Sequence, residues 1–146
     1  MDNYPHLYQA SASSSPGAPV HLSSPGLQPI ASMPPVQFGG PGDSWSPETL
    51  LVAAVADCFI LTFRAIAQAS KLEWLDLECT TRGTLDRVDN VTRFTRMDIS
   101  AKLRAPAGTD EHKATRLLQK AEAVCLVSNS LSAEKHLEVS VEIAAG

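Results

Sequence analysis

The stretch WSPETLLVAAVADCFILTFRAIAQAS, residues 45–70, predicts the longest helix of the chain and largely determines the fold. Ser46 can act as the N-cap, Pro47 suits the first helical position, and Glu48 places a negative charge in the first turn. From Leu50 onward, apolar side chains fall on nearly every face, as they do in helices that are buried all round. Because so short a chain has few elements left to cover such a helix, the pattern predicts burial against a second copy of the chain.

Alternating segments after this helix predict half-buried strands at residues 75–82, 96–103 and 137–143, with a turn near 86–90. A second helix, with Thr109 as its expected N-cap, carries one apolar face and fades near Ser128 and Asn129. With short strands expected before the long helix, the order is strands, helix, strands, helix, strand. This order is typical of an α+β fold in which antiparallel sheet carries two helices.

The first 46 residues differ in composition from the rest. They hold eight of the ten prolines and nine serines, but only two charged residues. Composition alone favours a disordered arm, whereas the stretches 7–13 and 20–24 can each form a short extended strand. We therefore expect a single domain, 1–146, in which a strand-forming arm (1–37) that needs a partner surface precedes a core (38–146).

Charge and composition exclude several classes of function. The net charge is −4 and the sequence pI about 5.5, unlike the basic footprint of a nucleic-acid-binding protein. The N-terminus lacks the pattern of a signal peptide, and the longest apolar run is shorter than the ~18–20 residues that span a bilayer. We expect a cytoplasmic protein without nucleic-acid or membrane partners. The three cysteines are then core, metal-binding or catalytic residues, and the absence of CxxC and HxxxH motifs argues against a metal site.

The three cysteines differ in their surroundings. Cys79 lies on the apolar face of a predicted strand, where a free cysteine usually behaves as a small buried hydrophobe. Cys58 lies in the middle of the long helix and Cys125 on the apolar face of the second helix. Each of these two, taken alone, is more often a core residue than a catalyst, and neither lies at a helix N-terminus, where the pKa of a thiol falls. Periodicity therefore identifies no site.

Two sequence motifs, taken together, are similar to those of a known protein family. One is the glycine-rich approach FGGPG with the helix start WSPETLLVAAVADCF, within residues 38–59, and the other is AEAVCLVSNSL, residues 121–131. In this order, with their cysteines 67 residues apart, they resemble the OsmC/Ohr family of thiol peroxidases. The match covers roughly residues 38–143.

The resemblance implies an intertwined homodimer of OsmC-like fold, with the long helices packed together and the sites at the subunit interface. It implies that Cys58 attacks an organic hydroperoxide and becomes a sulfenic acid, that Cys125 resolves it as a disulfide, and that an external dithiol reduces the disulfide. No metal or bound organic cofactor is implied. Glu48 matches the family's glutamate; ten residues of helix place it about 15 Å from Cys58, so we expect any role to operate across the dimer. Its simpler role is a first-turn acid that suits the helix dipole.

One departure keeps other functions open. Peroxidases of this family typically place an arginine from the N-terminal strands beside the reactive cysteine, but no arginine or lysine precedes Arg64 here. His6 or His21 could substitute in part, or an arginine could come from the partner chain. This gap favours an alternative function, a non-catalytic homodimer that binds a small apolar ligand at its interface. A cysteine hydrolase would need His112 or His136 beside a cysteine and is the least favoured alternative.

Overall fold

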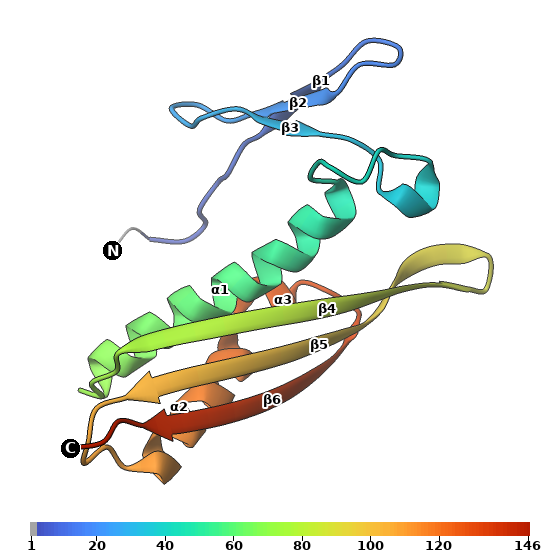
Figure 1. Cartoon of the computed structure of the whole chain (residues 1–146). Helices are drawn as coiled ribbons and strands as arrows, with labels where there is room; N and C mark the ends of the chain where they lie inside the picture. Colours follow the sequence, from blue (N-terminus) through green and yellow to red (C-terminus); the bar gives the residue numbers. More distant parts are fainter. Residues whose placement is uncertain (1–2) are drawn as a thin grey trace. The chain divides into compact units, whose positions relative to one another are not determined.

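A computed structural model describes residues 3–146 of the chain, shown in Figure 1. The chain forms two compact units, Met1–Leu50 and Leu51–Gly146, and the secondary structure confirms the α+β class. The first unit holds a small sheet and the start of the long helix, and the second holds a larger sheet, the rest of that helix and two further helices.

The sheet of the first unit has three short antiparallel strands, β1 (Ser11–Ser13), β2 (Val20–Ser23) and β3 (Ile30–Ser32), in the order β1-β2-β3. β1 is shorter than the stretch expected to be extended, and β3 was not predicted. β3 has only three residues, too few for an alternating pattern to be visible in sequence. A 3-10 turn, η1 (Val36–Phe38), follows before the long helix.

The long helix α1 spans Pro47–Ala69, as the sequence predicted to within a residue at each end. Ser46 caps it: the Thr49 N–H donates to the Ser46 Oγ at 3.2 Å, and the Ser46 N–H donates to the Thr49 Oγ1 at 2.9 Å. This reciprocal pair satisfies two main-chain donors and fixes where the helix begins. Ser46 is buried although it is polar, because its hydrogen-bonding groups are paired within the cap.

The larger sheet has the order β4-β5-β6, with β4 (Asp76–Val88), β5 (Val91–Ala105) and β6 (Glu134–Ile143). β4 and β5 form an antiparallel hairpin around a turn at Asp89 and Asn90, within the predicted turn. The expectation of purely antiparallel sheet is wrong here, because β6 pairs with β5 in parallel. A helical crossover links these two strands. It carries the chain back to the end of the sheet where β5 begins, so that β6 runs in the same direction as β5.

The crossover consists of two helices, α2 (Glu111–Val124) and α3 (Leu126–Asn129). Asp110, rather than Thr109, is the N-cap of α2, because its Oδ1 accepts the N–H groups of His112 and Lys113. Within this unit, the helices lie along one face of the sheet (Figure 1). The helical segment expected to fade near Ser128 is thus two helices joined at Cys125.

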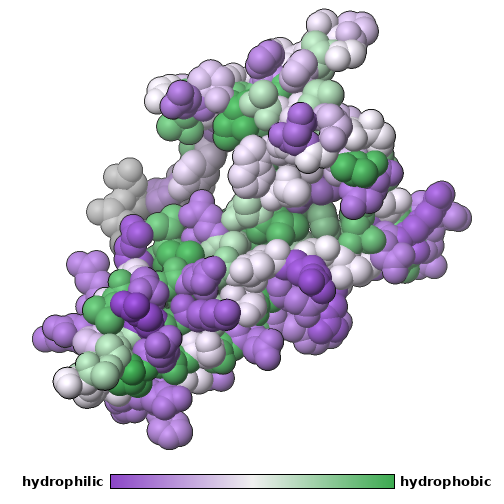
Figure 2. Space-filling view, in the orientation of Figure 1, coloured by the Kyte–Doolittle hydropathy of each residue, from purple (hydrophilic) through white to green (hydrophobic). Residues whose placement is uncertain are grey.

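The core lies between the helices and the inner face of the larger sheet. It is formed by one stripe of α1, alternate residues of β5 and one face of α2: Val55, Phe59, Phe63, Ala67, Ile99, Ala101, Leu103, Ala114, Leu117, Leu118 and Ala121. Outside its stripe, α1 carries apolar residues that this single chain covers only partly, and Figure 2 shows hydrophobic surface over the path of the helix. By length and composition alone α1 could cross a membrane, but the core helix of a soluble protein meets the same test.

The core stripe of α1 gives a prediction for stability. Phe63 is fully buried and meets the ring of Trp74 edge-to-face, with centroids 5.7 Å apart. Phe63→Ala should lower the free energy of unfolding by about 3–5 kcal/mol, because it removes apolar contact and leaves a cavity. Phe38→Ala, at a side chain that is 58% exposed, is the matched control and should change it by less than about 1 kcal/mol. Urea unfolding at one protein concentration measures both, and equal losses would contradict this packing.

Candidate functional site

Cys58 lies on α1 next to the core stripe, between the buried residues Val55 and Phe59 in sequence. Its side chain is half-buried. Its Sγ lies 3.8 Å from the Oγ1 of Thr62, one turn further along the helix. The thiol of Cys125 and the main-chain groups of Val127 and Leu126 also lie close enough to lower the pKa of this sulfur. Two segments that are distant in sequence therefore converge on one thiol.

Cys125 joins α2 to α3, and its conformation ends one helix and begins the other. Its φ of −62° and ψ of 113° are extended rather than helical. Its carbonyl accepts the N–H of Asn129 at 2.9 Å and the hydroxyl of the buried Ser128 at 3.3 Å. The side chain is only 1% exposed. The turn thus holds Cys125 firmly against Cys58 and away from water.

The pKa values of these two thiols move in opposite directions. Burial raises the pKa of Cys58, but hydrogen bonds from the Val127 N–H, the Cys125 thiol, Thr62 and the Leu126 N–H together outweigh it, so that its pKa lies below the ordinary value. Burial raises the pKa of Cys125, and the negative charge of the Cys58 thiolate raises it further, against hydrogen bonds from Ser128. The pair favours one arrangement, in which Cys58 is the thiolate and Cys125 the thiol that donates to it.

The third cysteine, Cys79, lies on β4 and packs against the core, as the sequence predicted. Burial raises the pKa of its thiol, and a hydrogen bond with Thr81 opposes this effect only in part. Cys79 is therefore near the pair but has the properties of an inert core thiol.

Glu48, the remaining site residue expected from the sequence, lies in the first turn of α1. Its Oε1 is buried and has no hydrogen-bond partner among residues 3–146. The structure brings Cys58 and Cys125 together but gives Glu48 no hydrogen bond to either thiol.

A family model described as "OsmC-like protein" matches residues 40–140, which contain both cysteines of the pair. The chain belongs to the OsmC family. The uncharacterized protein YmaD of Bacillus subtilis is 34% identical over 118 residues, 75% of this chain and 76% of that protein. The family resemblance seen in the sequence is therefore confirmed.

Solved structures with the OsmC fold agree with this assignment. An organic hydroperoxide resistance protein OsmC from Legionella pneumophila aligns with a TM-score of 0.75 and 25% identity, covering 96% of this chain and 99% of that one. An OsmC-like protein of unknown function from Vibrio cholerae aligns with a TM-score of 0.83 over 93% of this chain and 100% of that one. At 17% identity, the second likeness concerns the fold alone.

Compared with the OsmC peroxidase pattern, the pair lacks a basic partner within the described chain. None of the groups that hydrogen-bond to Cys58 is a lysine, arginine or histidine. His112 lies in the exposed first turn of α2, and the Nε2 of His136 lies 3.2 Å from the Oε1 of Glu134, although without hydrogen-bond geometry. The cysteine hydrolase alternative gains no support, since neither histidine is among the partners of a cysteine thiol.

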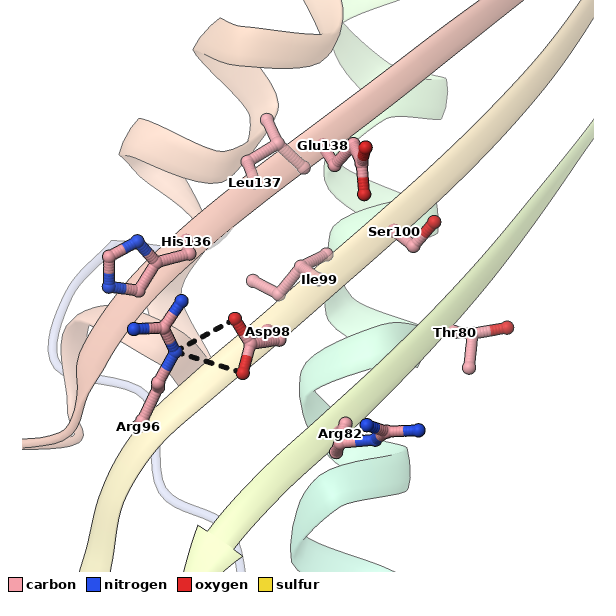
Figure 3. A pocket seen from close by; sticks show the side chains of 9 residues that line it. All are labelled: Thr80, Arg82, Arg96, Asp98, Ile99, Ser100, His136, Leu137 and Glu138. Carbon is pink, nitrogen blue, oxygen red and sulfur yellow. Dashed lines mark hydrogen bonds and ion pairs between the residues drawn. The ribbon is translucent and has the colours of Figure 1, made fainter.

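The outer face of the larger sheet carries a separate depression of about 470 Å³. Figure 3 shows Arg96 paired with Asp98 beside His136, with Arg82 and Glu138 on the flanking strands. Such paired, exposed charges are usual on a solvated sheet face. Among residues 3–146, no group of three or more His, Cys, Asp or Glu residues is arranged to hold a metal ion.

Sequence reasoning missed the main-chain groups of the site. The N–H donors of Leu126 and Val127 depend on a turn rather than on side-chain type, so no residue pattern reports them. The available signal was the Ser128-Asn129 pair just after the cysteine, since both residues favour local turns and caps over helix interiors.

The opposite pKa shifts predict a selective reaction with iodoacetamide. Because the thiolate is the nucleophile, Cys58 should be alkylated first as the pH rises from 6, with a midpoint below that of an ordinary thiol. Cys79 and Cys125 should react at higher pH, since burial raises both of their pKa values. Peptide mapping of timed reactions measures each site. Equal rates at all three cysteines near pH 7 would contradict the assignment.

Proposed function

We propose that this chain is a thiol-dependent peroxidase that reduces organic hydroperoxides, with Cys58 as the nucleophile and Cys125 as the resolving thiol. The observation that carries the proposal is the hydrogen-bonded pair itself, in which the pKa of Cys58 is lowered and that of Cys125 raised. A reactive cysteine requires a thiolate at neutral pH, and a resolving cysteine must lie within reach of it. Membership of the OsmC family and the likeness to an organic hydroperoxide resistance protein support the same function.

The chemistry proceeds in three balanced steps. The Cys58 thiolate attacks the terminal oxygen of the hydroperoxide, so that an S–O bond forms as the O–O bond breaks, and the alkoxide takes a proton and leaves as an alcohol. The Cys125 sulfur then attacks the sulfenic sulfur, forming the disulfide and releasing water. An external dithiol reduces this disulfide by two exchanges and is itself oxidised to a disulfide. Cys125 lies close enough to Cys58 to lower its pKa, as a resolving thiol must.

The preferred substrate would be a hydroperoxide with an apolar substituent. Leu126 and Val124 flank Cys125 in sequence and are 71% and 51% exposed, an unusual exposure for large apolar side chains beside a buried thiol. An apolar chain that covered these residues would remove their surface from water, which hydrogen peroxide cannot do. We place the reaction in the cytoplasm, where dithiol reductants keep most thiols reduced.

The working form would be a homodimer joined along α1. Leu61 is 49% exposed in the single chain, and Leu51 and Val52 are only half-buried, although the helix is apolar around much of its circumference. The apolar surface left on a helix of 23 residues is better accounted for by a second copy than by solvent. Glu48 would then meet any partner group across the dimer rather than within its own chain.

The alternative is a non-catalytic homodimer that binds a small apolar ligand at its interface. The observation in its favour is the lack of any lysine or arginine before Arg64, because a cation beside the sulfur is a common way to stabilise a thiolate. The two functions differ in whether a hydroperoxide changes the covalent state of the cysteines.

Oxidation with cumene hydroperoxide tests the proposed function. One equivalent added to the reduced protein at pH 7 should produce a Cys58–Cys125 disulfide, identified by peptide mapping. Cys58→Ser should abolish peroxide consumption, because the nucleophile is lost. Cys79→Ser is the matched control and should leave the rate of peroxide consumption unchanged. Thiols that stayed reduced for hours in the wild-type protein would refute the peroxidase and favour the ligand-binding alternative.

Removal of the resolving thiol has its own signature. Cys125→Ser should consume one equivalent of hydroperoxide per chain and then stall, because the sulfenic acid at Cys58 has no thiol to condense with. Intact mass spectrometry should show the addition of one oxygen, followed by two or three with excess peroxide. Sustained turnover with a dithiol reductant at the wild-type rate would show that Cys125 does not resolve the intermediate.

Sedimentation tests the dimer. The wild-type protein should sediment at twice the 15.6 kDa of one chain, and Leu61→Glu should shift it toward the monomer, since a buried carboxylate at the interface is costly. Leu85→Glu, at a 37% exposed leucine on β4, is the control and should leave the mass unchanged. A monomeric wild-type protein, or a dimer unaffected by Leu61→Glu, would contradict an interface along α1.

A further inference from the structure

β6 carries one charged side chain in the row of residues that faces the core. The register with β5 identifies this row, because each of its members pairs with a buried residue of β5: Lys135 with Met97, Leu137 with Ile99, Val139 with Ala101, Val141 with Leu103 and Ile143 with Ala105. The other members of the row are apolar, and only Lys135 is not. Because a lysine seldom lies against a core unless its charge is paired or hydrogen-bonded, its ammonium must find a partner nearby.

The ammonium of Lys135 has a defined partner. Its Nζ donates to the main-chain carbonyl of Leu131 at 2.8 Å, and the lysine is half-buried. Leu131 lies between α3 and β6, and its side chain packs against the core. Hydrogen bonds with an ionised donor are roughly twice as strong as neutral ones. This bond therefore ties the chain that leaves α3 to the strand that follows it.

Further hydrogen bonds lead from Leu131 back to the resolving cysteine. The Leu131 N–H donates to the Ser128 carbonyl at 3.1 Å, and the Ser128 hydroxyl donates to the Cys125 carbonyl at 3.3 Å. Ser128 and Cys125 are both almost completely shielded from water. Lys135 is thus one end of a series of hydrogen bonds whose other end is the main chain of Cys125.

The other side of the same segment is fixed by α2. The Cys125 N–H donates to the Glu122 carbonyl at 3.3 Å, and the Asn129 Nδ2 donates to the Ala123 carbonyl at 3.1 Å. Cys58, by contrast, lies on α1, and within residues 3–146 no lysine is among the groups that act on its sulfur. Loss of the bond to the Leu131 carbonyl should therefore loosen residues 126–131 and leave Cys58 in place.

We propose that Lys135 is a positioning residue for the resolving step, which holds residues 126–131 so that the Cys125 sulfur stays within reach of the oxidised Cys58. This role rests on the proposed function, in which Cys125 attacks the sulfenic sulfur, the S–S bond forms as the S–O bond breaks, and the oxygen leaves as water with the thiol proton. An S–S bond is only about 2.05 Å long, so a small displacement of the turn should slow its formation steeply. The earlier attack of Cys58 on the hydroperoxide should not depend on Lys135.

Three substitutions separate the hydrogen bond from other effects of the lysine. Lys135→Met removes the ammonium but keeps a long apolar side chain, which suits the inward row of β6. Lys135→Arg keeps a charged donor for the Leu131 carbonyl and should restore the wild-type behaviour. Lys113→Met is the matched control, because the Lys113 Nζ donates in the same way to the Ser70 carbonyl, at 2.9 Å, just beyond the end of α1.

Intact mass spectrometry after rapid acid quenching follows both steps when reduced full-length protein reacts with one equivalent of cumene hydroperoxide. In Lys135→Met the disulfide should form roughly tenfold more slowly than in the wild type, the scale of one hydrogen bond from a charged group. Hydroperoxide should disappear at the wild-type rate, so that the sulfenic acid accumulates. Lys135→Arg and Lys113→Met should behave as the wild type. Unchanged disulfide formation in Lys135→Met, an equal slowing of both steps, or an equal effect of Lys113→Met would overturn the positioning role.

Equilibration with mixtures of reduced and oxidised dithiothreitol tests the same contact without hydroperoxide. The reagent exchanges with the two cysteines, so the fraction of Cys58–Cys125 disulfide measures how well the sulfurs are held for bonding. Lys135→Met should need a roughly tenfold higher ratio of oxidised to reduced reagent for half-formation, whereas Lys113→Met should match the wild type. An unshifted equilibrium would overturn the inference. The expected shift in a protein that consumes no hydroperoxide would uphold the placing of Cys125 by Lys135 while refuting the proposed function.

Discussion

The packing of the α1 stripe against the inner face of the larger sheet is the contact on which the rest of the second unit depends. Phe59 and Phe63 are almost completely buried there, together with residues of β5 and α2. Cys58 directly precedes Phe59, so a helix fixed in rotation by its aromatic residues also fixes the direction of the thiol. Because close-packed interiors resist small shifts, the sulfur stays where the turn at Cys125 can reach it.

The same packing explains how two identical side chains acquire different pKa values. Both thiols are buried in part, and burial alone would raise both pKa values. The difference comes from their neighbours, because main-chain and side-chain groups around Cys58 lower its pKa, whereas the charge on Cys58 raises the pKa of Cys125 further. Since a charge shared by two close groups settles on the better-stabilised one, the asymmetry is a property of the pair rather than of either cysteine.

The sequence predicted most of the architecture but not the details that create the site. Residues 45–70 specified α1 because capping and apolar pattern agreed, and alternation located β4, β5 and β6. The parallel pairing of β6 was not predictable from alternation, which has the same period in both kinds of sheet. Cys58 and Cys125 were selected only through resemblance to a family, because a catalytic and a buried cysteine occupy the same apolar positions of a helix.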